Sequence, residues 1–326
     1  MTNSSFERHL ALSGAWSAAD TLGCVRSADE TGVDGFWQTD VEFSRDCYSL
    51  LGAIGAATSN IKVAPGVSNP YTRHPAQIAA AIGTLSDITG GRVIAGLGAG
   101  GSGLTRIGVV RSDPLATVAA AVHAIRALLA GERHSVKAST FELNDGALEF
   151  PVAKPPPRIA IVAHGKRMYA LAGELADIVV IGNYATVEGI TWAIEHIRKG
   201  ASIRSPALGE LKVIGRVDVC VADNRSNARD HARKRTRAFL RSGYYGAAFL
   251  EPLGLASLAG RDDLGDDEIE RVVDATGFAG STDDVSRGTT SLIDSGLLHG
   301  VCARLETVPG GALSDAWHIL SQGWAN

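Results

Sequence analysis

The chain has 326 residues, of which 45% are hydrophobic and 20% charged, a composition typical of an ordinary globular protein. Its 31 Lys and Arg residues are balanced by 35 Asp and Glu residues, so no excess of positive charge favours contact with nucleic-acid phosphates. No stretch reaches the roughly 20 consecutive apolar residues of a membrane span, and Met1–Arg8 lacks the apolar core of a secretion signal. We expect neither a nucleic-acid nor a membrane partner.

The four cysteines are Cys24, Cys47, Cys220 and Cys302. They lie far apart and form no close pair with one another or with a histidine, so neither a zinc-ligand pattern nor a disulfide framework is indicated. We therefore predict no metal site and a protein of the reducing cytoplasm.

Short apolar runs alternate with longer amphipathic segments from Arg8 to about Gly131. This alternation predicts βαβ units and a parallel sheet. The segment Pro75–Thr89 carries typical helix signals, since proline stands in its first turn and two glycines follow its end. In this half we predict strands at His9–Leu12, Gly35–Thr39, Ile61–Gly66 and Val93–Gly98, and helices at Ala18–Thr31, Arg45–Thr58, Pro75–Thr89 and Asp113–Leu129.

The alternation is interrupted twice in the second half. Between Glu132 and Pro157, short β-like pieces at Thr140–Leu143 and Leu148–Phe150 precede three prolines, which predicts a surface excursion. Gly243–Gly277 lacks a strand signal and is predicted to be a helical insertion. Elsewhere we predict strands at Arg158–Ala163, Asp177–Ile181, Leu211–Cys220 and Gly300–Ala303, and helices at Lys166–Leu175, Val187–Lys199, Arg225–Leu240, Thr282–Ser295 and Ala312–Gln322.

Eight βα units predict an α/β fold, a (β/α)8 TIM barrel formed by one domain over residues 1–326, with excursions near 132–157 and 243–277. A doubly wound sheet is disfavoured because its glycine-rich fingerprint is absent after the first strand. Barrel sites form at the carboxyl ends of the strands. The segments there are Gly14–Trp16, Thr39–Glu42, Gly66–Arg73, Gly98–Arg106, His164–Arg167, Asn183–Tyr184, Asp218–Asp223 and Arg304–Glu306.

Four segments carry a family resemblance. Gly66–Pro75 reads GVSNPYTRHP, Thr84–Gly100 contains TLSDITGGR and GLGAG, Ala163–Asp177 begins AHG, and Ala279–Val285 reads AGSTDDV. Together they resemble the luciferase-like monooxygenase superfamily, and within it the branch that uses the 5-deazaflavin coenzyme F420, especially methylenetetrahydromethanopterin reductases. The likeness spans about Gly32 to Val301.

The resemblance implies a barrel that holds a flavin or deazaflavin ring at its carboxyl-terminal mouth. The ring would lie against a bulged third strand with a cis non-prolyl peptide, for which the matching bond is Gly66–Val67. The implied cofactor is coenzyme F420, with FMN as the alternative. The residues expected to bind it are Gly66, Val67, Ser68, Asn69, Gly98, Gly100, Ala163, His164, Gly165, Lys166 and Arg167.

Two segments are candidates for the cofactor's phosphate. The helix that opens at Gly165 offers free N–H groups and a favourable dipole, and Lys166 and Arg167 add positive charge. Alternatively, both basic side chains are solvated residues of a first helical turn. Gly98–Gly103 could bind phosphate through successive N–H groups, although such a run is also common in flexible connections.

Asp40 and His164 are the candidate catalytic residues, because they are titratable groups at strand ends. We predict that Asp40 orients substrate or cofactor and that His164 contacts the cofactor or supplies a proton; Asp40 could instead cap a helix. Alcohol and sugar-phosphate dehydrogenases of the family carry His where Val41 stands. The pterin reductases carry Glu in the first strand, and His9–Leu12 contains none. Both departures count against those two reactions.

Several nearby residues have structural interpretations. His74 is expected to cap or pack the helix that follows it, and Arg73 to pair with a neighbouring acid. The basic run Arg225–Arg241 is predicted to be a solvated helix face. The aromatic residues that either wall an apolar pocket or pack at its rim are Trp16, Trp37 and Tyr71.

The predicted function is a deazaflavin-dependent oxidoreductase that moves a hydride between its coenzyme and an electrophilic C=N, C=C or C=O bond of a small substrate. Two alternatives remain open at this point. One is an FMN-dependent two-component monooxygenase, and the other is a non-catalytic flavin-binding protein, because a fold does not determine a function. We expect a homo-oligomer, either a dimer or a dimer of dimers.

Overall fold

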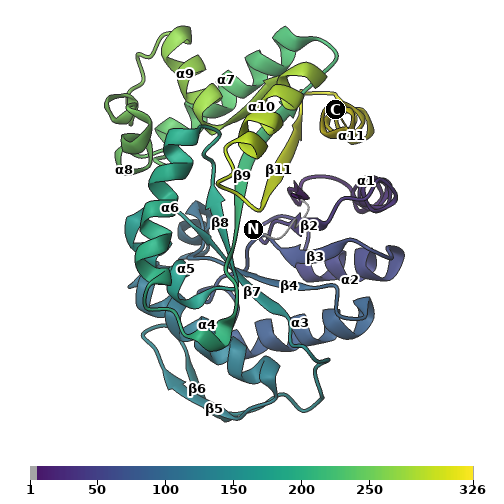
Figure 1. The fold of residues 1–326 in the computed structure, drawn as a ribbon, viewed down its shortest axis with the longest axis vertical. Helices are drawn as coiled ribbons and strands as arrows, with labels where there is room; N and C mark the ends of the chain where they lie inside the picture. Colours follow the sequence, from purple (N-terminus) through teal and green to yellow (C-terminus); the bar gives the residue numbers. More distant parts are fainter. Residues whose placement is uncertain (1–5, 326) are drawn as a thin grey trace.

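A computed structural model describes residues 6–325, and within that range eight parallel strands form a ring (Figure 1). The order around the ring is β3-β2-β1-β11-β9-β8-β7-β4, and the bridges Val63–Val93 and Ser68–Leu97 join β3 to β4. The predicted (β/α)8 barrel is confirmed. Its strands are β1 (Glu7–Leu12), β2 (Gly35–Gln38), β3 (Lys62–Pro65), β4 (Ile94–Leu97), β7 (Arg158–Ala163), β8 (Ile178–Gly182), β9 (Lys212–Val221) and β11 (Gly300–Thr307).

Helices cover the outside of the ring, and none within residues 6–325 is long and apolar enough to cross a membrane. In α3 the predicted boundaries are confirmed: Nδ1 of His74 accepts from the N–H of Ala76 at 3.1 Å, and Gly90 ends the helix with φ +63°. The helices of the ring are α1 (Ala18–Glu30), α2 (Cys47–Ala57), α3 (Pro75–Thr89), α4 (Pro114–Ala130), α5 (Lys166–Leu175), α6 (Val187–Ala201), α7 (Arg225–Arg241), α10 (Thr282–Asp294) and α11 (Leu313–Ala325).

Two excursions lie at opposite ends of the molecule (Figure 1). The first contains an antiparallel hairpin of β5 (His134–Lys137) and β6 (Glu142–Gly146). The predicted β-like piece Leu148–Phe150 is wrong, because Phe150 instead packs its ring on α3, where a Cβ on Gly83 would lie 2.8 Å from it. The second contains the predicted helices, α8 (Ala247–Leu250) and α9 (Asp266–Thr276). Short 3₁₀ turns are η1 (Ser102–Ile107), η2 (Pro206–Leu208), η3 (Glu251–Leu253) and η4 (Ala256–Leu258).

The sequence prediction missed one further strand, β10 (Gly277–Gly280), which pairs with the carboxyl-terminal part of β9. Its residues, GFAG, include two glycines, which are depleted in strands. A Cβ on Gly277 would lie 2.0 Å from the carbonyl oxygen of Asp218, so the close pairing of the two backbones requires glycine here.

Small and branched side chains, together with Trp37, fill the interior of the barrel. All four cysteines are free and buried, and Cys302 belongs to this interior layer. The buried side chains of the layer are Ala11, Trp37, Ala64, Ile94, Ala160, Ile178, Val180, Ile214 and Cys302.

A chain of hydrogen bonds runs from this layer toward the amino-terminal end of the barrel. Nε1 of Trp37 donates to Nδ1 of His9 at 2.9 Å, and Nε2 of His9 lies 3.2 Å from the carboxylate of Glu7. Nζ of Lys212 donates to the same carboxylate at 2.5 Å. Burial raises the pKa of Glu7, but the hydrogen bonds from His9 and Lys212 outweigh it and hold the pKa well below its usual range. The first strand thus begins two residues earlier than predicted and does contain a glutamate, which corrects the expectation that it has none. Glu7 is the first residue of β1, at the end remote from the mouth.

Candidate active site

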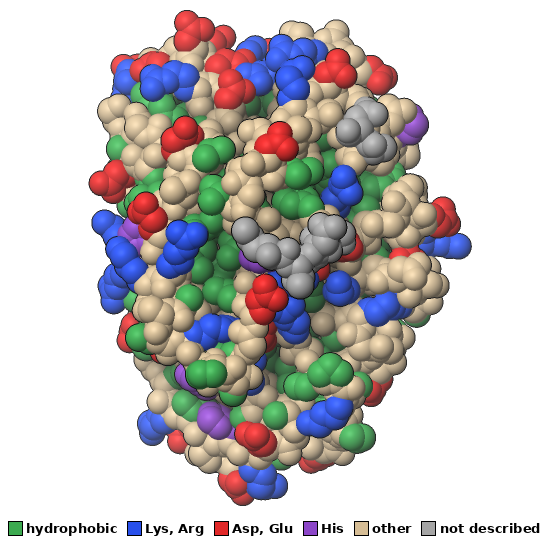
Figure 2. Space-filling model, in the orientation of Figure 1, with side chains coloured by type: hydrophobic (Ala, Val, Ile, Leu, Met, Phe, Trp, Pro, Cys, Tyr) green, Lys and Arg blue, Asp and Glu red, His purple; other side chains and the backbone are tan. Residues whose placement is uncertain are grey.

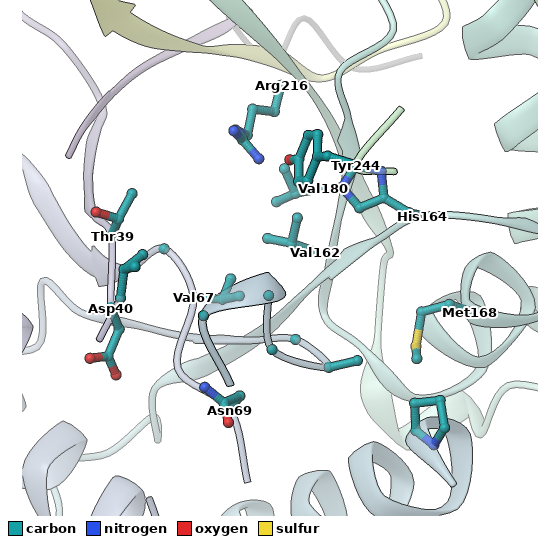
Figure 3. A pocket seen from close by; sticks show the side chains of 18 of the residues that line it. Thr39, Asp40, Val67, Asn69, Val162, His164, Met168, Val180, Arg216 and Tyr244 are labelled. Carbon is teal, nitrogen blue, oxygen red and sulfur yellow. The ribbon is translucent and has the colours of Figure 1, made fainter. Parts of the chain in front are cut away.

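A largely apolar cavity of about 730 Å³ opens at the carboxyl ends of the strands (Figure 3). Two predicted cofactor residues, Ser68 and Ala163, do not line it, and both are fully buried behind its wall. The predicted site residues that do line it are Asp40, Gly66, Val67, Asn69, Gly98, Gly100, His164, Gly165, Lys166 and Arg167. The structure therefore brings together residues that follow β2, β3, β4 and β7.

The end of β3 forms a bulge in the cavity wall. The peptide bond between Gly66 and Val67 is cis, as predicted. The N–H of Gly66 donates to the carbonyl of Gln38 in β2 at 2.7 Å, and the N–H of Ser68 donates to a carbonyl of β4 at 3.1 Å. A Cβ on Gly98 would lie 2.6 Å from Cγ2 of Val67, so the valine packs on bare backbone. Figure 3 shows its side chain in the cavity.

Asp40 follows β2 and is held by a hydroxyl relay behind the cavity wall. Oγ of Ser68 donates to Oδ2 of Asp40 at 2.6 Å, and the hydroxyl of Tyr48 lies 2.9 Å from that Oγ. Burial raises the pKa of Asp40, although Ser68 and Arg73, whose Nε is 3.9 Å away, lower it. The carboxyl group is therefore more easily protonated than an exposed Asp.

Arg73 confirms its structural interpretation, since its Nη2 donates to Asp46 at 3.2 Å and its guanidinium stacks on Tyr48. Among the three aromatic candidates, only Trp37 lines the cavity. The hydroxyl of Tyr71 donates to the carbonyl of Ser112 at 2.7 Å instead.

His164 follows β7 and lies across the cavity from Asp40 (Figure 3). Its ring covers the backbone of Gly182, where a Cβ would be 2.3 Å from it, and meets the ring of Tyr244 at a centroid distance of 5.9 Å. The ring is exposed to the cavity, yet enclosure by the surrounding protein, reinforced by the guanidinium of Arg216, lowers the pKa of His164 to about 4. The imidazole is thus neutral at pH 7, which suits a hydrogen-bonding contact.

The first turn of α5 forms one rim of the cavity. Gly165 precedes the helix with φ +78°, and the side chains of Lys166 and Arg167 are exposed. Arg111 joins them in the cavity lining, and its Nη1 donates to the carbonyl of Gly100 at 3.2 Å. The free N–H groups of a helix start and three cations suit a phosphate group.

Sequence reasoning did not single out Arg216 and Tyr244, which also line the cavity. Arg216 lies inside the predicted strand Leu211–Cys220, but it alternates with Ile214 and Asp218, a period that places all three on one face. The charged residues Arg216 and Asp218 at this spacing could have identified Arg216 as a residue of the inner face. Tyr244 comes from the helical insertion and donates its hydroxyl to Oδ1 of Asn183 at 3.3 Å, a contact that has no local sequence signal.

The prediction that Arg225–Arg241 is a solvated face is wrong for part of α7. Arg229 is only 15% exposed and pairs with Glu270 and Asp274. Arg235 is 13% exposed, because the side of α7 that packs on β9 carries it toward the barrel. Figure 2 shows positive and negative side chains interspersed at the end of the molecule formed by α7 and α9.

Comparison with known proteins identifies the family. The sequence model of the luciferase-like monooxygenase family matches residues 3–297. The chain belongs to this family. The match covers seven of the eight strands of the ring, all except β11.

Two relatives of this luciferase-like chain carry the same name. The 5,10-methylenetetrahydromethanopterin reductase of Archaeoglobus fulgidus is 35% identical over 210 residues, which cover 64% of this chain and 62% of the relative. The chain thus aligns with somewhat less than two thirds of that protein. The enzyme of the same name from Methanolobus tindarius is 30% identical over 285 residues, covering 84% of this chain and 86% of the relative.

Two solved structures share the barrel. The coenzyme F420-dependent tetrahydromethanopterin reductase of Methanopyrus kandleri superposes with a TM-score of 0.76 at 22% identity, covering 98% of each chain. An F420-dependent secondary alcohol dehydrogenase in complex with an F420–acetone adduct superposes with a TM-score of 0.74 at 17% identity, covering 97% of this chain and 98% of that one. At such identities these structures support the fold.

Proposed function

We propose that the protein is a coenzyme F420-dependent oxidoreductase that transfers a hydride between the coenzyme and an electrophilic C=N, C=C or C=O bond of a small substrate. The observation that carries the proposal is the cavity itself, which combines a largely apolar space of about 730 Å³ with a cationic rim at the start of α5. The names of the relatives and the sequence match around Gly66–Pro75 support the deazaflavin over other ring cofactors.

The residues present fit this coenzyme. Its ring would lie on Val67 and the bare backbone of Gly66 and Gly98, where the glycines leave room for close approach. Its phosphate would lie at Lys166 and Arg167. When bound, the deazaflavin accepts or donates a hydride at ring carbon 5. The protein's own contribution is to fix the ring and the substrate in a reactive geometry and to exclude water.

Hydride delivery to a double bond leaves an atom that needs a proton. Asp40 is the better placed donor, because burial favours its protonated form and the Ser68 hydroxyl fixes its orientation. His164, which is neutral at pH 7, would hold ring or substrate by a hydrogen bond. Replacing Asp40 with Asn and His164 with Gln should each lower turnover by about 10²-fold or more while changing coenzyme affinity by only about a fewfold. Full turnover in both variants would assign the proton to solvent or to the substrate.

A titration with coenzyme F420 and with FMN tests the proposal. We expect the deazaflavin to bind at least about tenfold more tightly, a difference of about 1.4 kcal/mol. Tighter binding of FMN would favour the two-component monooxygenase. Binding of either cofactor without hydride transfer to any electrophile would leave a flavin-binding protein.

We also propose that residues 1–326 fold as a single domain and that the protein assembles as a homodimer or a dimer of dimers in the cytoplasm. Light scattering of the purified protein measures the assembly, and one calorimetric unfolding transition would agree with one domain.

A further inference from the structure

The inner faces of β9 and β11 carry a cluster of charged side chains at the mouth of the barrel. Because side chains alternate along a strand, Arg216 and Asp218 follow Ile214 on the inner face of β9. Arg304 and Glu306 follow Cys302 in the same way on β11. Arg216 therefore stands opposite Cys302 at the top of the apolar interior, and Arg304 stands one layer higher, opposite Asp218. Both arginines line the cavity.

The two carboxylates of this cluster are already engaged by other cations. Nε of Arg304 donates to Asp218 at 2.7 Å, and its Nη2 lies 2.6 Å from Glu306. Arg235 from α7 forms ion pairs with the same two carboxylates, and the hydroxyl of Tyr245 donates to Asp218 at 3.0 Å. Arg304 and Arg235 thus balance the charges of Asp218 and Glu306.

Arg216 is the third arginine of the cluster and has no carboxylate of its own. Its Nη2 lies 3.6 Å from Asp218, and within residues 6–325 its guanidinium takes part in no hydrogen bond. The side chain is 18% exposed, and Figure 3 shows it pointing into the cavity beside Tyr244. The other carboxylates of the cavity, Asp40 and Glu42, follow β2, which is three strands away around the ring. One positive charge remains uncompensated at this wall.

We propose that Arg216 binds a carboxylate of the substrate, so that the enzyme acts on a small carbonyl, imine or alkene compound with a single carboxylate group. This inference rests on the proposed hydride-transfer function. A guanidinium matches a carboxylate through two parallel hydrogen bonds. A monoanion neutralises the single excess charge, whereas a phosphate dianion would leave a negative excess in an enclosed site. The carboxylate would hold the adjacent double bond above the apolar layer, next to His164.

Titration of two matched ketones tests this assignment. Calorimetry with 2-oxobutanoate and with 2-butanone compares the same carbonyl with and without a carboxylate, in the presence and in the absence of coenzyme F420. We expect the wild-type protein to bind 2-oxobutanoate at least about tenfold more tightly, with an advantage that shrinks as salt is added. Arg216→Gln should reduce the advantage to about twofold or less.

Two further variants serve as a control and as a substitute for Arg216→Gln. Arg237→Gln removes an arginine of α7 that pairs with Asp266 outside the cavity, so it should retain the whole preference. Arg216→Lys keeps the positive charge and loses the planar guanidinium, so it should retain only part of the preference for 2-oxobutanoate. If thermal denaturation shows that Arg216→Gln is unfolded, Arg216→Lys takes its place in the test.

Coenzyme titrations separate this inference from the proposed function. If the wild type binds F420 and shows no preference for 2-oxobutanoate, the carboxylate assignment is overturned while hydride transfer stands. If Arg216→Gln loses F420 affinity and keeps the preference, the guanidinium serves the coenzyme ring and the inference is overturned. Tighter binding of inorganic phosphate than of 2-oxobutanoate would assign the site to phosphorylated substrates instead. If the wild type does not bind F420, the proposed function fails, and the preference measured without coenzyme still decides the role of Arg216.

Discussion

The contact between Gly98 and Val67 gives a direct test of the ring platform. In Gly98→Ala the new Cβ would lie 2.6 Å from Cγ2 of Val67, about 1 Å inside the usual carbon–carbon contact distance. Val67 cannot rotate away easily, because a β-branched side chain is restricted at χ1. Hydrogen bonds to β2 and β4 also fix the backbone on both sides of the bulge. Overpacking of this kind costs about 1 to 3 kcal/mol.

If the ring lies on Val67, displacement of the bulge also weakens coenzyme binding. We expect Gly98→Ala to bind F420 at least about tenfold more weakly, which corresponds to about 1.4 kcal/mol. Gly52→Ala is the matched control, because nothing lies within 4 Å of its new Cβ and it lies in α2, outside the cavity lining. Adding Val67→Ala to Gly98→Ala removes the clashing methyl group and should restore part of the affinity. Wild-type affinity in Gly98→Ala, measured by calorimetric titration, would refute the platform.

Three further variants test the rim, the proton donor and the base of the barrel. The double variant Lys166→Ala and Arg167→Ala should weaken F420 binding at least about tenfold. It should also flatten the salt dependence of binding, since both cations are exposed and are therefore screened by salt. Unchanged affinity would mean that both side chains contact only solvent. Because burial raises the pKa of Asp40 above its ordinary 3.8, turnover should fall as pH rises through that pKa, and this limb should vanish from the pH profile of Asp40→Asn. Glu7→Gln should destabilise the protein by about 3 kcal/mol at neutral pH in denaturant titrations. Burial raises the pKa of Glu7, but the hydrogen bonds and charges of His9 and Lys212 outweigh it and hold the pKa below its unfolded value. This stabilisation is therefore present above about pH 4.3 and is lost as pH falls through the folded pKa. A constant difference in stability down to low pH would contradict the ion pairing.

Local sequence patterns were sufficient for most of the fold. Proline at the start and glycine at the end bound α3, and apolar runs between turn residues locate the eight strands of the ring, because these signals depend on a few neighbouring residues. The same logic fails for β10, where Gly277 is required by the approach of Asp218, a residue 59 positions earlier in the chain. It also fails for Phe150, whose apolar character serves packing on α3.

In the candidate site, too, some features could be predicted from the sequence and others depend on residues far apart in the chain. The wall formed by Gly66 and Val67 could be predicted because the segment Gly66–Pro75 resembles the corresponding segment of the luciferase-like family. The charge balance could not, since it depends on the register between distant strands. Arg304 stands opposite Asp218 in the ladder of β11 and β9, 86 residues apart, and α7 then adds Arg235 from outside.

This register determines why Arg216 is the cation left for a ligand. A shift of one residue between β9 and β11 would turn the inner face of one strand outward. In the observed register Arg216 stands opposite Cys302, a residue without charge, and Arg304 takes the nearest carboxylate. An arginine two layers higher, at position 220, would stand opposite Glu306 and be neutralised within the protein. The position of Arg216 at the boundary between the apolar interior and the charged layer is therefore what leaves its guanidinium available inside the cavity.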